Sequence, residues 1–351
     1  MSTWIHIDGS HGEGGGQMLR TALSLSVLTG RPVRFERIRA GRKKPGLMRQ
    51  HKTCVEAAAR VSGAHTTGVE LGSKDVTFEP AGRFAGDYRF EIATAGSTSL
   101  VLQTVLYPLL FAEGTSTVEV TGGTHAAMAP SFTFLKKTFS PILQAMGADL
   151  QLELIRPGYF PAGGGCVRMT VTGVERLNPV DLSGKADNKA LSAVATVAQI
   201  PAHVAERELR NLAGLLPIPK PRLYTNRCTR SVGPGNVLHV EVPVEGPVPR
   251  TEVFCAYGKR GVRAETVAAD LAKEVKAFTT SGTDVSEHLA DQLQIPLALA
   301  GGGSFTCNTV SQHARTNAEI IERFLDSEFE ATELGPGRHQ LEVSAAQLQD
   351  G

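Results

Sequence analysis

The chain has 351 residues, which is enough for two domains or one large domain with a sizeable core. Its net charge of +1 excludes a global attraction to nucleic acid or acidic membranes, so any polyanion site must be a local patch. Five scattered cysteines without a C-x-x-C pair disfavour a disulfide framework or a zinc site. With no signal-peptide pattern and no apolar stretch of membrane length, we expect a cytoplasmic protein.

The predicted elements alternate between strands and helices. The first unit reads strand, helix, strand, helix and two strands, at 5–8, 16–29, 33–39, 45–61, 66–71 and 76–79. The order recurs with a period of roughly 80 to 90 residues, and a third copy begins near Leu182 and resumes after Ser281. We therefore expect an α/β (α+β) fold of three β-α-β-α-β-β repeats, with a smaller α/β domain inserted in the third.

The segment between the two parts of the third copy does not follow the period. It has helix patterns at 190–200 and 265–282 and strand patterns at 237–244 and 252–258. We expect a repeat-built catalytic domain at 1–184 and 282–351, and an inserted α/β domain at 185–281.

The loop "DGSHGEGGGQMLR" links the first strand to the first helix but contains Glu13 and lacks a Walker lysine. Glu13 is either an acidic residue favoured at a helix N-terminus or the ligand of a divalent metal beside a bound phosphate. Gln17 and Arg20 lie one turn apart on one helix face, and Arg20 could bind such a phosphate.

Basic residues dominate the stretch 34–52, which contains a single acidic residue, Glu36. Arg37 and Arg39 alternate along the predicted strand and should share a face, and Arg42 follows a glycine turn. The stretch is either a solvated basic loop or a surface for phosphate contacts; the pattern slightly favours polyanion binding.

Three further stretches contain residues that could take part in chemistry. "GGTHAAMAPSF" leads into a helix whose N-terminus could bind an anion, although His125 could equally be a packing residue. "RPGYFPAGGGCV" is typical of a tight β-connection. In the third, His288, Asp291 and Gln292 can share one helical face, and His313 stands where a strand gives way to a helix. A histidine at a helix start is more often a cap or packing residue than a catalytic one.

Together these stretches resemble the RNA 3′-terminal phosphate cyclase family. The resemblance lies in "DGSHGEGGGQMLR", "RAGRKKPGLMRQH", "GGTHAAMAPS", "PAGGG", "HLADQL" and "SQHARTN", which follow the family's order across nearly the whole chain. It implies the repeat fold expected above and an ATP-dependent reaction on RNA with a 3′-phosphate end. In that reaction a histidine–AMP intermediate forms, AMP passes to the RNA phosphate, and the 2′-hydroxyl closes a 2′,3′-cyclic phosphate. The resemblance also implies adenylylation of 5′-phosphate nucleic-acid ends as a side activity.

The resemblance assigns roles residue by residue. His313 matches the nucleophile, and Glu13 matches the glutamate that binds a divalent metal, Mg or Mn. Residues that match the ATP or phosphate site are Gln17, Arg20, Gln103, Pro130, His288, Asp291 and Gln292. Residues that match the RNA-binding site are Arg39, Arg42 and Gln50.

Two positions depart from the family pattern. His288 stands where the family often has the tyrosine that stacks on adenine, and imidazole offers less stacking area. Pro157 stands where the glycine signature begins with histidine, which we interpret as structural.

Two other functions remain as alternatives. A non-catalytic branch of the family acts in ribosome assembly but lacks the nucleophile, whereas this chain has His313, Glu13 and Arg20. Enolpyruvyl transferases have related repeats but form no enzyme–AMP adduct. The motifs therefore favour the cyclase.

Overall fold

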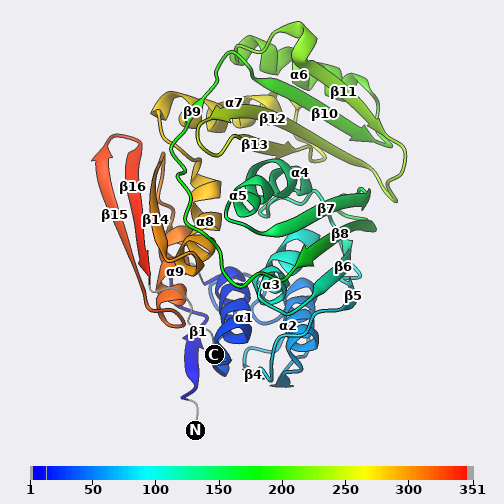
Figure 1. Ribbon diagram of the computed structural model, residues 1–351. Coiled ribbons are helices and arrows are strands. Elements are labelled where there is room, and N and C mark those ends of the chain that lie inside the picture. The colour runs from blue at the N-terminus through cyan, green and yellow to red at the C-terminus, as the bar shows by residue number, and fades with distance from the viewer. Residues whose placement is uncertain (1–2, 13, 346–351) are drawn as a thin grey trace.

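The computed structural model describes residues 3–12 and 14–345, and its fold is mixed α/β (Figure 1). The first sheet has the strand order β1-β2-β4-β3, in which β1 and β2 are parallel and the other pairs are antiparallel. These strands are β1 (Ile5–Asp8), β2 (Val33–Glu36), β3 (His65–Thr67) and β4 (Val76–Glu79). The accompanying helices are α1 (Gln17–Thr29) and α2 (Arg49–Ser62).

The second sheet has the equivalent order β5-β6-β8-β7, again with one parallel pair followed by two antiparallel pairs. Its strands are β5 (Asp87–Glu91), β6 (Thr115–Gly122), β7 (Asp149–Arg156) and β8 (Gly165–Thr172). The first helix of this unit is α3 (Thr98–Leu110). The second is a run of α4 (Phe132–Phe134), a π-helical turn (Leu135–Phe139) and α5 (Ser140–Ala145).

The C-terminal unit has a three-stranded antiparallel sheet of order β14-β16-β15. Its elements are α8 (Glu287–Leu299), β14 (Gly302–Cys307), α9 (Gln312–Glu322), β15 (Ser327–Gly335) and β16 (Arg338–Ala345). The strand that follows Leu182 is β9 (Lys185–Ala186), which pairs with β12 rather than with this sheet, and Val285 makes a single parallel bridge to Cys307. The organisation as three repeats stays a prediction, as do the domain boundaries.

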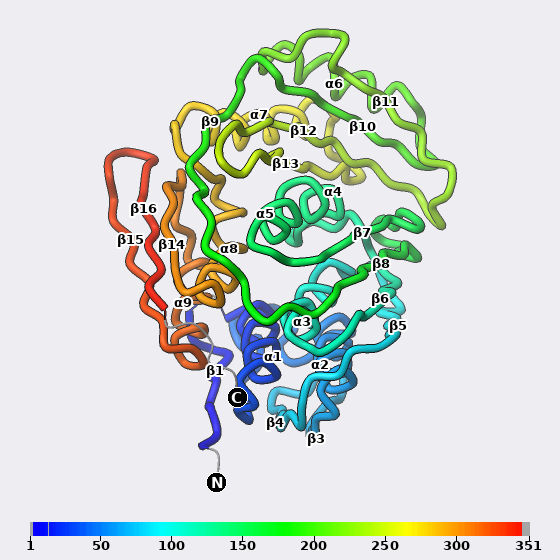
Figure 2. Tube along the Cα trace, viewed as in Figure 1, coloured from blue at the N-terminus to red at the C-terminus, as the bar shows by residue number. Residues whose placement is uncertain are grey.

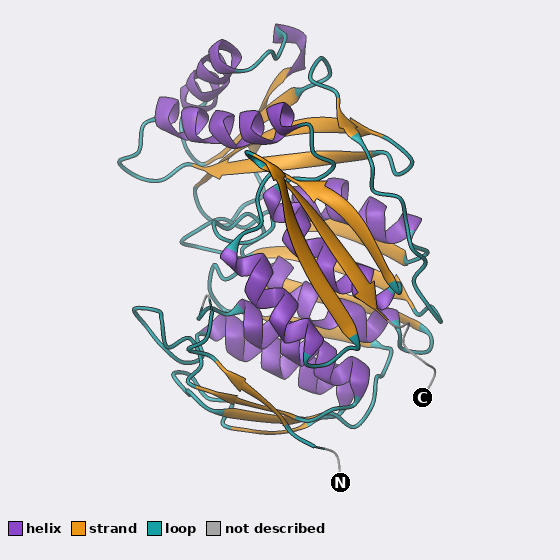
Figure 3. Cartoon of the chain, turned by 90° about the vertical axis from the view of Figure 1, so that its left-hand side faces the viewer, coloured by secondary structure: helices purple, strands orange, loops and turns teal. Residues whose placement is uncertain are grey.

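Residues 185–281 form a five-stranded sheet of order β11-β10-β12-β13, with β9 paired to β12. Its elements are β9 (Lys185–Ala186), β10 (Ser192–Ala198), α6 (His203–Leu215), a 3-10 turn (Lys220–Arg222), β11 (Leu223–Cys228), β12 (Gly235–Glu245), β13 (Arg250–Tyr257) and α7 (Ala264–Ser281). Helices α6 and α7 cover one face of this sheet (top of Figure 3) and enclose a hydrophobic core separate from the main one.

The helix predicted at 190–200 is wrong, because this segment is the strand β10. Small and β-branched residues such as Ala193, Ala195 and Val197 are buried, and the strand lies between β11 and β12. A short apolar run of this kind has no periodicity that distinguishes a strand from a helix, so tertiary packing decides its state.

The strand predicted at 33–39 is also too long, since β2 ends at Glu36. Arg37 and Arg39 have φ values of 52° and 57°, in the left-handed region, and therefore do not share a strand face. Turns here are closed by hydrogen bonds from the Ala40 N–H to the Arg37 carbonyl and from the Arg42 N–H to the Arg39 carbonyl, both at 3.0 Å. Gly9 packs so closely against this segment that a Cβ there would lie 2.7 Å from the Arg37 carbonyl oxygen. The following helix begins at Arg49 rather than at Pro45, because the chain before it pairs with loop backbone.

The main core positions the site, because helices from the first, second and C-terminal units pack against one another in it. Helix α1 contacts both α3 and α9, and α8 contacts α9. Figure 2 shows α1 and α9 side by side, although they come from opposite ends of the chain. None of the helices in the described part of the chain is long and apolar enough to span a bilayer.

Candidate functional site

A cleft lies where α1, α3, α8 and α9 meet, and it brings together residues that are far apart in the sequence. Seven of the predicted site residues line it: Gln17, Arg20, Gln103, Pro130, Asp291, Gln292 and His313. The other lining residues are Thr21, Ser24, Leu100, Tyr107, Met128, Ile295 and Asn317. The cleft therefore draws on the first, second and C-terminal units.

Glycines in the opening loop allow these units to approach closely. Gly12 has a φ of 57°, and a Cβ there would collide with the Thr316 side chain on α9. A Cβ at Gly16 would collide with Nε2 of His51 and lie 3.0 Å from Nη1 of Arg20. Glycine is thus required at both positions by close contact with neighbouring elements.

Asp291 on α8 is the centre of a buried polar network. Its Oδ1 accepts a hydrogen bond from Nε2 of Gln17 at 2.8 Å, and its Oδ2 accepts one from Nε2 of Gln292 at 2.8 Å. Gln103 donates in turn to Gln292. Each carboxylate oxygen therefore has an amide donor, as expected of a buried acidic residue.

His313 lies beside this carboxylate, with its Nδ1 3.0 Å from Oδ1 of Asp291. Its side chain is 37% exposed, whereas that of Asp291 is 7% exposed, so the imidazole can reach a ligand while the carboxylate stays covered. A proton on Nδ1 directed at Asp291 leaves the lone pair on Nε2. This arrangement is suited to nucleophilic attack by Nε2.

Hydrogen bonds hold the start of α9 in place around His313. Ser311 caps the helix, because its Oγ accepts from the Ala314 N–H at 3.1 Å. Asn317, one turn further on, accepts from Thr21 Oγ1 at 2.7 Å and donates to Gln294 Oε1 at 2.8 Å. These bonds tie α9 to α1 and α8, which fixes the position of His313.

A positively charged group of residues adjoins the cleft. Burial lowers the pKa values of Arg20 and Arg39, but a guanidinium remains charged in proteins. His51 is buried near both, and burial together with these two charges lowers its pKa to about 3. His51 is therefore neutral, and the net positive charge favours an anion such as phosphate.

The backbone conformation of the basic stretch explains where its side chains lie. Arg39 folds back and donates to the carbonyls of Lys44 at 2.7 Å and Gly46 at 2.9 Å. Gln50 accepts a hydrogen bond from the Ser97 N–H at 2.6 Å, which links α2 to the start of α3. Arg42 is exposed. None of these three residues lines the cleft itself.

Two predicted site residues remain, His288 and Glu13. His288 lies on the first turn of α8, is exposed, and is not among the cleft-lining residues. Glu13 lies outside the described residues. Within the described residues, no group of three or more histidine, cysteine or acidic side chains could hold a metal ion.

Residue patterns alone did not identify three polar groups of the site. His51 follows Gln50 in the basic stretch, but its position between Arg20 and Arg39 depends on how α1 and α2 pack. Thr21 and Asn317 belong to the network that joins α1 and α9. Their spacing could have indicated them, because His51, Thr21 and Asn317 each follow a predicted site residue by one to four positions on the same helix.

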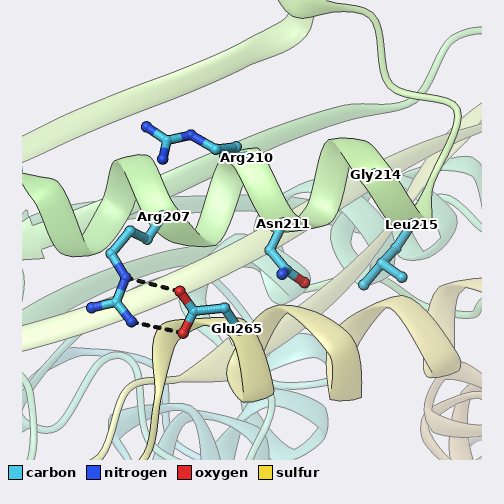
Figure 4. A pocket seen from close by; sticks show the side chains of 6 residues that line it. All are labelled: Arg207, Arg210, Asn211, Gly214, Leu215 and Glu265. Atoms are coloured by element: carbon cyan, nitrogen blue, oxygen red, sulfur yellow. Dashed lines mark hydrogen bonds and ion pairs between the residues drawn. The ribbon is translucent and has the colours of Figure 1, made fainter.

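A second hollow lies between α6 and α7 in the inserted segment (Figure 4). Its main polar feature is the Arg207–Glu265 pair, with N–O distances of 2.8 and 2.7 Å. Both side chains are 42% exposed, and no predicted site residue lies there. The charges of Arg207 and Glu265 neutralise each other, and within the described residues no polar side chain that lines the hollow other than these two is shown to converge with them as the groups of the first cleft do.

Comparisons with known proteins agree with the resemblance in the sequence. The family model described as RNA 3′-terminal phosphate cyclase matches residues 11–331. The chain is 50% identical over 332 residues to the RNA 3′-terminal phosphate cyclase of Koribacter versatilis, covering 94% of this chain and 92% of the relative. It is 46% identical over 330 residues to the protein of that name from Ectopseudomonas mendocina, covering 94% and 95%.

Among solved structures, the enolpyruvyl transferase NikO from Streptomyces tendae matches at a TM-score of 0.32 and 10% identity. That match covers 97% of this chain but only 48% of the other, and it is too weak to support an inference. The family model and the two relatives span nearly the whole chain. The chain therefore belongs to the RNA 3′-terminal phosphate cyclase family.

Proposed function

We propose that this protein uses ATP to convert the 3′-terminal phosphate of RNA into a 2′,3′-cyclic phosphate through a histidine–AMP intermediate. The observation that carries the proposal is the pairing of His313 with Asp291 at 3.0 Å in a cleft that also contains Arg20. A nucleophile, the group that orients it and a cation for phosphate thus meet in one place. The names of the two relatives support the same reaction.

In the first step, Nε2 of His313 attacks the α-phosphorus of ATP, an N–P bond forms and pyrophosphate leaves. Asp291 accepts the Nδ1 proton in a hydrogen bond and stabilises the positive charge that develops on the ring. Arg20 offsets negative charge on the phosphates. The remaining residues that we assign to ATP are Gln17, Gln103, Pro130, His288 and Gln292.

In the second step, an oxygen of the RNA 3′-phosphate attacks the adenylate phosphorus, and the N–P bond to His313 breaks. In the third, the neighbouring 2′-hydroxyl loses its proton and attacks the RNA phosphorus, and AMP leaves with the bonding electrons. Because this last attack is intramolecular, positioning supplies much of its rate. We assign Arg39, Arg42 and Gln50 to binding of the RNA end. We also propose that nucleic acids with a 5′-phosphate end are side substrates.

A divalent metal, Mg or Mn, would neutralise charge on the triphosphate when bound. Glu13 is the residue that we assign to it. On one side of this position Gly12 lies against Thr316 of α9, and on the other side Gly14 lies near Gly41. Magnesium commonly uses one or two carboxylates together with substrate phosphates, so a single protein carboxylate is compatible with this assignment.

The test is incubation of the protein with α-labelled ATP and Mg or Mn in the absence of RNA. We expect covalent label in an acid-labile, base-stable bond, and its complete loss in His313→Ala. His65→Ala, at an exposed histidine on β3, is the matched control and should label normally. Label retained by His313→Ala would place the nucleophile elsewhere. Absence of label in the wild type would favour the assembly-factor function.

A further inference from the structure

The loop between β7 and β8, residues 157–164, is held rigidly although it lies at the surface. Tyr159 is 4% exposed, bridges to His125 on one side and Gly163 on the other, and its ring lies 5.5 Å from that of His125. The Gly163 N–H donates to the Tyr159 carbonyl at 2.7 Å, which closes a tight turn. The tip of this loop therefore has one defined conformation.

The turn presents a large aromatic side chain to solvent. Phe160 is 79% exposed, directly after the buried Tyr159. Val232, which is 59% exposed, packs against the same loop, because a Cβ at Gly164 would lie 2.6 Å from its Cγ2. Isolated exposed hydrophobic residues are common, but here the aromatic ring stands on a hydrogen-bonded loop that also contacts a second exposed apolar side chain, which suits the loop to binding a ligand.

Two arginines flank the same loop. Nε of Arg156 donates to the Gly164 carbonyl at 2.6 Å, and Nη1 of Arg230 lies 3.4 Å from the Ile155 carbonyl. Both are exposed, and within the described part of the chain neither forms an ion pair with a carboxylate. Their charges are thus available to an anionic ligand.

One set of contacts joins the loop to the chain segment that leads into the cleft, and a second set joins it to Gln50, which lies outside the cleft but is assigned to the RNA end. A Cβ at Gly163 would lie 2.7 Å from the Thr94 carbonyl oxygen, and one at Gly96 would lie 3.1 Å from Cβ of Gln50. On the other side, the Thr124 N–H donates to the Gly158 carbonyl at 2.9 Å, and the segment after Thr124 supplies the cleft residues Met128 and Pro130. An extended ligand that leaves the cleft can therefore reach the loop.

We propose that Phe160 is a stacking platform for a base upstream of the 3′ end of single-stranded RNA, with Arg156 and Arg230 beside the backbone phosphates. Single-stranded nucleic acid is commonly bound by aromatic stacking next to basic side chains, without sequence preference. This inference rests on the proposed function, because it takes the 3′-phosphate to lie in the cleft. It assigns the glycine-rich signature loop a role in binding RNA.

The experiment compares Phe160→Ala and Phe160→Trp with wild type on two RNAs of equal length, both ending in a 3′-phosphate. One is an intact oligoribonucleotide, and the other has abasic sites upstream of the terminal nucleotide. We expect Phe160→Ala to raise KM for the intact RNA about tenfold, because this is the usual strength of one stacking contact. Phe160→Trp should keep KM at the wild-type value. On the abasic RNA, all three proteins should share one high KM.

Phe84→Ala is the matched control. Phe84 is also an exposed phenylalanine, at 51%, and its N–H donates to the Val61 carbonyl near the C-terminal end of α2. It is therefore remote from Gln50, which is assigned to the RNA end and lies at the N-terminal end of the same helix. We expect its KM values to equal those of wild type. Label from α-labelled ATP without RNA, measured for every variant, shows that the adenylylation site is intact.

The proposal is overturned if Phe160→Ala leaves KM for intact RNA unchanged, or raises KM equally for the two RNAs. If wild type forms no histidine–AMP adduct, the proposed function fails. The platform is then tested by fluorescence anisotropy of the same two RNAs. Weaker binding of intact RNA alone by Phe160→Ala supports it, and equal binding contradicts it.

Discussion

Two buried carboxylates on helices, Asp291 in the cleft and Glu208 in the inserted segment, have very different surroundings. Asp291 receives an amide donor at each oxygen and lies 3.0 Å from His313. Glu208 is 0% exposed; its Oε2 accepts from Asn236 at 3.0 Å, but its Oε1 has no partner. Burial raises the pKa of Glu208 to about 7. Burial alone therefore does not identify a functional carboxylate; convergence of polar groups from different elements does.

The strongest test of this comparison is Asp291→Asn. The amide cannot balance positive charge on His313, and Gln17 and Gln292 each lose a charged acceptor. We expect the rate of histidine–AMP formation to fall about 10²-fold or more, by analogy with removal of a carboxylate that orients a catalytic histidine. The rate is measured from single-turnover incorporation of label from α-labelled ATP.

Asp284→Asn provides the matched control. Asp284 accepts hydrogen bonds from the N–H and Oγ1 of Thr306, both at 2.7 Å, just before α8 begins, and it lies outside the cleft. Its loss should lower Tm while the folded protein keeps its adenylylation rate. Equal rate losses in the two variants would mean that Asp291→Asn acts by distorting α8.

The part of the fold that was predicted correctly is the part with clear local patterns. The alternation at Ile5–Asp8 and Val76–Glu79 and the glycine at the end of α1 indicate those boundaries directly. By contrast, the 190–200 segment has no clear period, and sheet packing makes it β10. Arg37 and Arg39 alternate like strand residues, but both have positive φ values and the strand ends before them at Glu36.

The candidate site was predicted mainly through the family resemblance rather than from spacing. Gln17 and Asp291 are 274 positions apart, and only the packing of α9 against both α1 and α8 brings them together. No local pattern carries that information. His51 shows the limit of both approaches, because its pKa is lowered first by burial and then by the charges of Arg20 and Arg39, and all three arise only in the folded chain.

Glu208→Gln tests the other carboxylate of the comparison. The unfolded glutamate has a pKa near 4.5, and the folded one keeps its proton to about pH 7, so its stabilising contribution is present below pH 4.5 and lost as pH rises through 7. We expect the free energy of unfolding of the variant, taken relative to that of wild type, to rise by up to about 3 kcal/mol from pH 5 to pH 8. The free energy of unfolding from urea titrations at both pH values measures this, because other titrating groups cancel in the difference. Parallel pH dependences in the two proteins would show that Glu208 does not retain its proton.

The smallest effect is expected from Arg207→Ala, which opens the hollow between α6 and α7. The Arg207–Glu265 pair lowers the pKa of the Glu265 carboxyl, but both side chains are well exposed, and water and salt screen such pairs. We therefore expect Tm to change little and the rates of adenylylation and RNA cyclisation to stay at wild-type values. A loss of RNA cyclisation with normal adenylylation would instead make the hollow part of an RNA-binding surface. In that case an exposed ion pair such as Arg207–Glu265 would contribute to function, as the buried polar groups of the cleft are proposed to do.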